Sequence, residues 1–197
     1  MKNLRIILAS ASPRRKQLLE QLGWHFEVVR PDADETIFPG EKPELLVERL
    51  SQLKGAAVAK AHPDALIIAS DTVVVSPQGM IFGKPKDAVQ AADMLQMLSG
   101  CAHIVYSGLA LFLNGKCLCD HAGTKVVFRK LSSSDIQAYI NGGEWQGKAG
   151  AYAIQGRGSL LVDSIEGDYA SVVGLPLALL GHLLEGFGIT LGQMWEV

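Results

Sequence analysis

The sequence is poor in cysteine and lacks long apolar runs. Its 197 residues include three cysteines, Cys101, Cys117 and Cys119, and this sparse usage indicates no disulfide framework. No apolar stretch approaches the length of a membrane span, and the first residues lack the pattern of a secretory signal peptide. We therefore expect a cytoplasmic protein with reduced thiols and no membrane partner.

Charge is sparse as well. Charged residues make up 19% of the sequence and the formal net charge is -2, whereas domains that hold nucleic acid by bulk electrostatics carry a basic face. We therefore expect no stable nucleic-acid partner, although a few local cations could hold a small anionic ligand. Hydrophobic residues make up 48%, which is enough for a full core, and the length predicts a single domain over residues 1–197 or two small lobes.

Two common phosphate-binding motifs are missing. The pattern G-x-x-x-x-G-K-[ST] does not occur, so a P-loop is excluded. The short run Gly156–Gly158 lacks the third glycine and the strand–turn–helix unit of a dinucleotide fingerprint. Any phosphate site must therefore be built differently.

Periodicity predicts a mixed α/β fold. The early part of the chain alternates strands and helices, and the later part pairs strands in hairpins, one of them at Asn114-Gly115. In the helix that Pro43 opens, the expected buried stripe is Leu46, Val47, Leu50, Leu53 and Val58. The expected strands are residues 4–9, 26–29, 65–75, 104–113, 116–129, 159–165 and 169–173, and the expected helices are residues 13–22, 43–61, 88–98, 132–140 and 175–184.

An anion site is indicated near the N-terminus. The run Ser10–Lys16 follows an apolar strand, and Ser12 with Pro13 is typical of a helix start. Three cations then sit where the helix dipole is already positive, which is unfavourable unless an anion binds there. Free backbone N–H groups and two arginines favour phosphate, and a solvated basic turn is the alternative.

Two acidic residues, Asp71 and Glu35, are candidates for a catalytic or metal-binding role. Asp71 interrupts a strongly apolar strand, where a carboxylate is costly unless it is paired, bound to a metal or placed at an exposed end. It is therefore a candidate metal ligand or general base, with a purely structural role as the alternative. Glu35 lies in an acidic loop in which Asp32 or Asp34 could serve equally well.

Cationic and thiol side chains leave further alternatives open. Lys84 is held between Gly83 and Pro85, whereas Lys54 sits on an amphipathic helix where a lysine is normally exposed. A zinc site built from Cys117, Cys119, His103 and His121 is conceivable, but its spacing matches no usual zinc knuckle, and small side chains on a core face explain the pattern better.

Taken in order along the chain, these segments resemble the Maf family of nucleoside triphosphate pyrophosphatases. The resemblance runs from about residue 6 to residue 178 and covers nearly the whole chain. Its motifs are Leu8–Arg15 with Leu18-Leu19, Asp34-Glu35, Ser70–Val74, Gly83–Pro85, Ala149–Gly156, Gly167–Tyr169 and Val173–Pro176.

The resemblance implies a fold related to the inosine triphosphate pyrophosphatases. This is an elongated mixed β-sheet with flanking helices and two lobes around a deep cleft, here a single catalytic domain over residues 1–197. It also implies hydrolysis between the α and β phosphates of a nucleotide, with a divalent cation, Mg²⁺ or Mn²⁺, and a homodimer. Thr72 and the segment Ile154–Gly156 resemble the branch that acts on dTTP and UTP. Ala153, where glycine is common, is a small departure.

Roles carried over from the family fall on nine positions. Asp71 would activate water and, with Glu35, hold the metal. The positions that would choose the base are Arg14, Thr72 and Gln155. Those that would bind the phosphates are Ser10, Arg15, Lys54 and Lys84. Two alternatives stay open: a nucleotide-sensing or nucleic-acid-binding regulator of cell division without significant turnover, and a 7-methyl-GTP pyrophosphatase.

Overall fold

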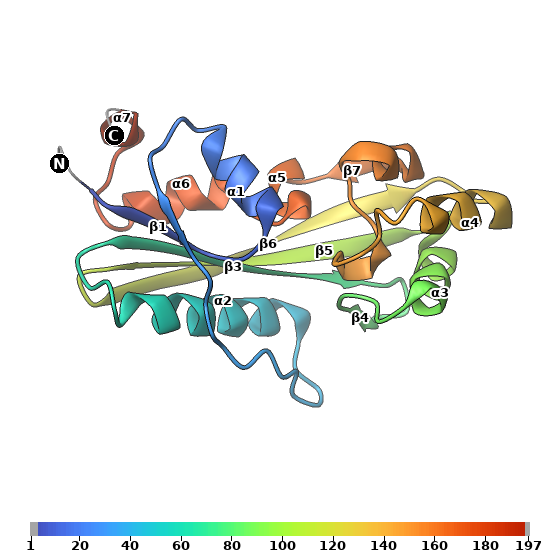
Figure 1. The fold of residues 1–197 in the computed structure, drawn as a ribbon, viewed down its shortest axis with the longest axis horizontal. Coiled ribbons are helices and arrows are strands. Elements are labelled where there is room, and N and C mark those ends of the chain that lie inside the picture. Colours follow the sequence, from blue (N-terminus) through green and yellow to red (C-terminus); the bar gives the residue numbers. More distant parts are fainter. Residues whose placement is uncertain (1–3, 196–197) are drawn as a thin grey trace. The chain divides into compact units, whose positions relative to one another are not determined.

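The computed structural model describes residues 4–195, and the chain divides into two compact units. Unit 1 comprises the chain up to Asp71, Ser107–Ala122 and the chain from Gly174 onward, and unit 2 comprises Thr72–Tyr106 and Gly123–Val173. The strands form one mixed sheet in the order β2-β1-β3-β5-β6-β7, with β4 paired to β3 (Figure 1). The predicted mixed α/β class is confirmed, and the cleft expected between two lobes stays a prediction.

Unit 1 carries the N-terminal strands and helices. Strand β1 pairs in parallel with β2 and with β3, and Asn114 and Gly115 turn β5 into β6 with positive φ angles of 49° and 76°, as a two-residue hairpin of this type requires. The elements wholly in this unit are β1 (Ile6–Ala9), α1 (Pro13–Glu20), β2 (Glu27–Val29), α2 (Pro43–Ala59), α6 (Leu177–Glu185) and α7 (Leu191–Met194). Strands β3 (Leu66–Val75), β5 (Ala102–Leu113) and β6 (Lys116–Phe128) contribute to both units.

Unit 2 carries the shorter elements. Strand β4 pairs antiparallel with the end of β3, and β7 pairs antiparallel with β6. Helix α3 begins after Asp87, whose side chain accepts from the Gln90 N–H, and α4 begins with a capping box at Ser132 and Asp135. The elements wholly in this unit are β4 (Ile81–Phe82), α3 (Ala88–Leu98), α4 (Ser133–Asn141), two 3₁₀ turns at Ala149–Ala151 and Gly156–Leu161, β7 (Val162–Glu166) and α5 (Tyr169–Val173).

Side-chain alternation on β1 and β3 sorts the core of unit 1 into two faces. Ile7, Ile67 and Ala69 pack together with Val58 of α2, so odd-numbered positions of these strands face α2. Even-numbered positions point to the opposite face, on which α1 and α6 lie (Figure 1). This alternation decides where the polar residues in the middle of β3, Ser70–Thr72, point.

Two predicted features are wrong. Residues Tyr169–Val173 form helix α5 and not a strand, because the Asp168 carboxylate accepts from the Ala170 N–H at 2.8 Å and so caps a helical turn. Residues Gly156–Leu161 form a 3₁₀ turn, which takes up the first three residues of the strand expected over 159–165, and only the residues from Val162 onward pair as β7. The first of these two segments shows that a local cap can outweigh the β-propensity of apolar residues.

Candidate active site

The turn from β1 into α1 is organised by two serines. Ser12 caps α1, its Oγ accepting from the Arg15 N–H, and the Oγ of buried Ser10 accepts from the Ser12 N–H at 3.1 Å. Arg15 is tied back to this turn because its Nη1 lies 3.5 Å from the Ser10 Oγ. The turn thus holds a guanidinium beside the N-terminus of α1, where the sequence predicts an anion site.

Gly174 gives this turn an anchor that the sequence did not indicate. Its carbonyl oxygen accepts from Arg15 Nε at 2.7 Å and from the Ser70 Oγ at 2.8 Å. Ser70 occupies an even-numbered position of β3, on the face of α1, as alternation requires. A contact across this length of sequence leaves no local pattern, so Ser70 and Gly174 could be found only as members of two separate motifs, Ser70–Val74 and Val173–Pro176.

Asp71 occupies the next position of β3 and therefore faces α2. There its Oδ1 accepts from Lys54 Nζ at 2.6 Å, and both side chains are buried. The second contact of the Lys54 ammonium is Glu35 Oε2, at 2.8 Å. The structure therefore brings Lys54, Asp71 and Glu35 together, and the buried carboxylate is paired, as its cost demands.

The burial of Lys54 corrects the expected stripe of α2. Leu53 is 41% exposed, whereas Lys54 is 7% exposed. The buried positions Val47, Ser51, Lys54 and Val58 follow each other at spacings of four and three residues, which is one face of a helix. This spacing was available in the sequence, but hydrophobicity alone selects the leucine.

The loop that carries Glu35 is fixed by Arg49 of α2. Its guanidinium donates to Glu41 and, at 2.9 Å, to the Thr36 carbonyl, and it stacks over the Phe38 ring. Asp34 is occupied within the loop, because its Oδ1 accepts from the Thr36 N–H and hydroxyl. Of the alternatives Asp34 and Glu35, it is therefore Glu35 that meets Lys54, and sequence reasoning missed Arg49 altogether.

The two arginines of α1 have different surroundings. Burial lowers the pKa of Arg15, and the negative charges of Asp71 and Glu35 oppose that shift, so its guanidinium senses the carboxylate pair. Successive residues of a helix diverge by about 100°, and Arg14 accordingly points elsewhere, half-buried. The third cation, Lys16, pairs with Glu20 on the exposed side of α1 and has no part in the site.

Unit 2 holds the remaining predicted site residues. Thr72 is half-buried on β3, Lys84 is exposed in the loop after β4, and Gln155 precedes the 3₁₀ turn Gly156–Leu161. The Glu144 side chain fixes the segment after Gln155, because its carboxylate accepts from the backbone N–H groups of Arg157 and Gly158 at 3.1 and 2.8 Å.

The two carboxylates beside Lys54 form a donor set that suits a divalent cation. Carboxylates of Glu35 and Asp71 converge on a single cationic atom, Lys54 Nζ, and carboxylate oxygens are the ligands that Mg²⁺ and Mn²⁺ prefer. The residues therefore fit the cation that the sequence predicts.

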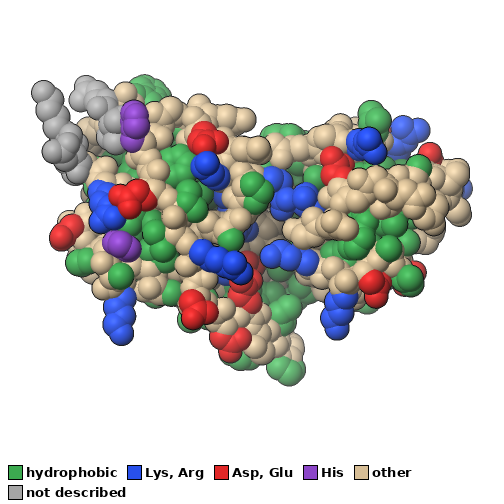
Figure 2. Space-filling view, in the orientation of Figure 1, with side chains coloured by type: hydrophobic (Ala, Val, Ile, Leu, Met, Phe, Trp, Pro, Cys, Tyr) green, Lys and Arg blue, Asp and Glu red, His purple; other side chains and the backbone are tan. Residues whose placement is uncertain are grey.

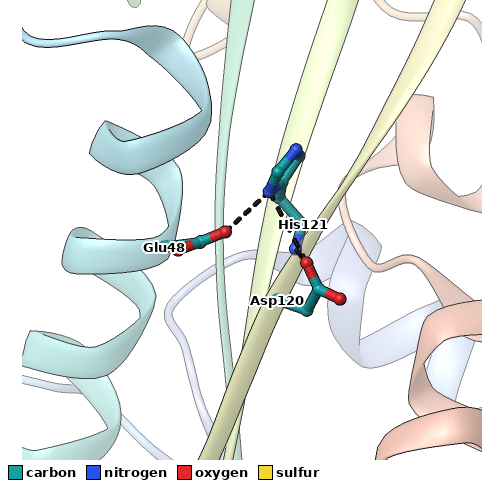
Figure 3. A group of neighbouring side chains, drawn as sticks. All are labelled: Glu48, Asp120 and His121. Atoms are coloured by element: carbon teal, nitrogen blue, oxygen red, sulfur yellow. Dashed lines mark hydrogen bonds and ion pairs between the residues drawn. The ribbon is translucent and has the colours of Figure 1, made fainter.

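A second group in unit 1 could also hold a metal ion. Glu48 of α2 meets Asp120 and His121 of β6, with His121 Nδ1 2.6 Å from Glu48 Oε1 (Figure 3). Glu48 and Lys54 lie six residues apart on α2, so their side chains diverge by about 120° and the two groups are separate. The hydrogen bond between His121 and Glu48 ties α2 to β6.

The zinc alternative is wrong for the residues first considered. His103 lies in unit 2, where its Nε2 bonds the Tyr152 hydroxyl at 2.8 Å. Burial raises the pKa of the Cys119 thiol to about 12, which disfavours the thiolate that zinc requires.

Both signs of charge occur on the face of the molecule that Figure 2 draws. Figure 2 shows Lys and Arg side chains interspersed with Asp and Glu on the side of the molecule in view. Among residues 4–195, no helix combines the length and the apolar character needed to cross a membrane.

Comparison with solved structures defines the fold class. The Staphylococcus aureus Ham1 protein superimposes with a TM-score of 0.54 and 14% sequence identity, over 93% of this chain and 99% of that one. The chain is therefore a mixed α/β protein of the Ham1 type, which is the fold expected from the inosine triphosphate pyrophosphatase resemblance.

The family follows from the sequence comparisons. Residues 5–187 match the family described as Maf-like protein, and the chain belongs to that family. It is 46% identical over 185 residues to the dTTP/UTP pyrophosphatase of Pelotomaculum thermopropionicum, covering 93% of this chain and 96% of that protein. It is 50% identical over 188 residues to the dTTP/UTP pyrophosphatase of Syntrophotalea carbinolica, covering 93% of this chain and 84% of that protein.

Proposed function

We propose that this chain is a dTTP/UTP pyrophosphatase, which releases a nucleoside monophosphate and pyrophosphate. The observation that carries the proposal is Lys54, a buried ammonium bonded to both Asp71 and Glu35. Two carboxylates and a cation held in this way serve phosphoanhydride hydrolysis, in which water must be activated and phosphate charge neutralised. The names of the relatives support the choice of substrate.

Asp71 is the proposed general base. Lys54 fixes one oxygen of its carboxylate, which leaves the other oxygen to accept a proton from the attacking water. The water oxygen then bonds to the α-phosphorus, the bond from that phosphorus to the bridging oxygen breaks, and pyrophosphate leaves. Since Lys54 also holds Glu35, it keeps both carboxylates in place before substrate arrives.

The phosphates would be bound by cations and hydroxyls from separate elements. Ser10 and Arg15 lie at the N-terminus of α1, where backbone N–H groups and the helix dipole also favour an anion. Lys54 and Lys84 supply further positive charge. Arg14, Thr72 and Gln155 are the proposed base-reading residues, because a glutamine offers the donor and acceptor that match the carbonyl and N3–H edge of uracil or thymine.

Glu35 and Asp71 are the proposed ligands of Mg²⁺ or Mn²⁺, which would neutralise phosphate charge when bound. The matched test compares Glu35→Gln with Glu48→Gln. We expect only Glu35→Gln to raise the metal concentration needed for half-maximal activity. If Glu48→Gln raises it instead, the catalytic metal sits with Asp120 and His121.

The test of the activity is a substrate screen with and without Mg²⁺ and Mn²⁺. Pyrophosphate release is measured from dTTP, UTP, CTP, GTP and 7-methyl-GTP, and we expect metal-dependent turnover highest on dTTP and UTP. Highest turnover on 7-methyl-GTP would move the chain to another branch of the family. Binding of nucleotides without any turnover would identify a sensor and overturn the proposal.

We also propose that the chain works as a single catalytic domain in a cytoplasmic homodimer, with a nucleotide as its small-molecule partner. The family resemblance supports the dimer. Sedimentation equilibrium at micromolar concentration tests it, and a monomer at all concentrations would contradict it.

A further inference from the structure

The backbone around Gly150 adopts a conformation that most residues avoid. Gly150 and Ala151 have φ angles of 66° and 62°, and an alanine in this left-handed region is strained by its Cβ. Such a conformation persists only where the surroundings impose it. Ala151 is fully buried, and the side chain of the following Tyr152 is bonded to His103.

Three separate segments of unit 2 meet at Gly150. Its N–H donates to the Gly83 carbonyl at 3.1 Å, which ties it to the loop after β4. A Cβ at Gly150 would lie 2.8 Å from Val74 Cγ2 and 3.0 Å from Val74 Cβ, so the backbone rests directly on β3. Val74 in turn pairs with Phe82 of β4, the residue before Gly83. Val74, Gly83 and Gly150 therefore lie together, and we call these three residues the Gly150 junction.

Each segment of the junction carries one proposed site residue a few positions away. Thr72 precedes Val74 by two residues, Lys84 follows Gly83 directly, and Gln155 follows Gly150 by five residues. Because the junction is packed without room for one further carbon atom, a displacement of one segment must displace the others.

We infer that Gly150 is a positioning residue that sets Thr72, Lys84 and Gln155 in one fixed arrangement. The base-reading contacts and the phosphate contact of unit 2 are then coupled through this glycine, although Gly150 itself touches no substrate. This inference rests on the proposed function, since it gives Gly150 a role only if those three residues bind the nucleotide.

The chain offers a matched pair of variants. Gly147 has a φ of 67°, nearly that of Gly150, but nothing lies within 4 Å of an added Cβ there. Gly147→Ala therefore carries the same backbone strain as Gly150→Ala without the collision with Val74. We expect Gly150→Ala to raise KM for dTTP roughly ten- to hundredfold and to narrow the preference for dTTP over GTP, because misplacement by about an ångström has effects of this size. Gly147→Ala should keep both values within about threefold of wild type.

A rescue variant separates positioning from simple damage. Val74→Ala makes room at the junction, so the double variant Gly150→Ala with Val74→Ala should regain most of the lost substrate preference. Should Gly150→Ala fail to fold, Val74→Ile presses a methyl group on the same point and should shift KM and preference in the same direction. Equal kinetics of the two glycine variants, or a loss without change in preference and without rescue, would overturn the inference.

Amide exchange without nucleotide distinguishes this inference from the proposed function. Gly150→Ala should speed exchange in peptides spanning residues 81–86 and 148–155 together, whereas Gly147→Ala should not speed exchange in the first of these. If wild type hydrolyses no nucleotide, the proposed function fails whatever the exchange shows. If wild type is active but the two peptides exchange independently, the inference about the Gly150 junction is contradicted and the proposed function stands.

Discussion

The two units hold their proposed site residues by different means. In unit 1, Lys54 bridges two carboxylates and Arg15 spans from α1 to Gly174, so charged side chains make the decisive contacts. In unit 2, the backbone takes part in each of the corresponding contacts: the Gly150 N–H donates to the Gly83 carbonyl, and the Glu144 carboxylate accepts from the N–H groups of Arg157 and Gly158. We infer from this difference that ion pairs place the groups proposed for chemistry, Asp71 and Lys54, and that a fixed backbone places two of the residues proposed to read the base, Thr72 and Gln155.

The largest effect is expected in unit 1 at Asp71. Asp71→Asn keeps the size of the side chain but removes the proton acceptor, so turnover of dTTP should fall by about 10²–10⁴ while nucleotide affinity stays within a few-fold. Steady-state kinetics and calorimetric titration measure the two quantities, with exposed Asp93→Asn as the control. Wild-type turnover in a folded Asp71→Asn protein would make Asp71 structural.

Lys54 tests whether the ion pairs of unit 1 also stabilise the fold. Lys54→Met leaves Asp71 buried without its partner, which should cost about 3–5 kcal/mol, or roughly 6–20 °C in Tm. Adding Asp71→Asn should restore part of that stability but no activity. Lys16→Met breaks an exposed pair with Glu20 and should change the free energy of unfolding by under about 1 kcal/mol. If Lys54→Met and Lys16→Met lower the free energy of unfolding equally, the buried ion pairs of Lys54 do not stabilise the fold more than an exposed pair does.

Gln155 and Thr72 test recognition in unit 2. Gln155→Glu with Thr72→Gln replaces the donor–acceptor edge by one richer in acceptors, which suits guanine better than uracil or thymine. We expect dTTP and UTP hydrolysis to lose about 1–3 kcal/mol of transition-state stabilisation per unmatched group, with a relative gain on guanine nucleotides. Ratios of kcat/KM over five nucleotides measure this. An unchanged ranking would mean that backbone groups of residues 147–158 read the base.

His103 gives unit 2 a pH-dependent stability. Burial lowers its pKa to about 4, below the unfolded value of about 6.5, so the unfolded chain binds more protons between these values. Its contribution is therefore complete above pH 6.5 and lost as the pH falls towards 4, with a loss of about 2 kcal/mol at pH 5. Urea unfolding measures the free energy of unfolding at pH 7.5 and at pH 5. The difference between these two values should be smaller in His103→Gln than in wild type by about 2 kcal/mol. The exposed His25→Gln should leave the difference unchanged.

Sequence predicts what local patterns determine. Residues a few positions apart were enough to predict the Ser12 cap of α1 and the Asn114-Gly115 turn. They also indicated that the Asp71 carboxylate, set in an apolar strand, needs a partner. The strand predicted over Tyr169–Val173 was wrong because a single helix cap, Asp168, outweighs the β-propensity of these residues. Leu53 was chosen over Lys54 because a buried lysine is recognised only with its partners, Asp71 and Glu35, which lie 17 and 19 residues away. Contacts of Arg15 and Ser70 with Gly174 reach still further along the chain.

The division of work between the units is tested most directly by one kinetic ratio. The ratio of kcat/KM for dTTP to kcat/KM for GTP is measured for wild type, Asp71→Asn at high enzyme concentration, and Gln155→Glu. We expect Asp71→Asn to lower kcat/KM for dTTP and for GTP by the same factor and so to keep the ratio. We expect Gln155→Glu to lower the ratio by roughly tenfold or more, as one unmatched hydrogen-bonding group does. A ratio that changes with Asp71→Asn and stays constant with Gln155→Glu would contradict this division of work.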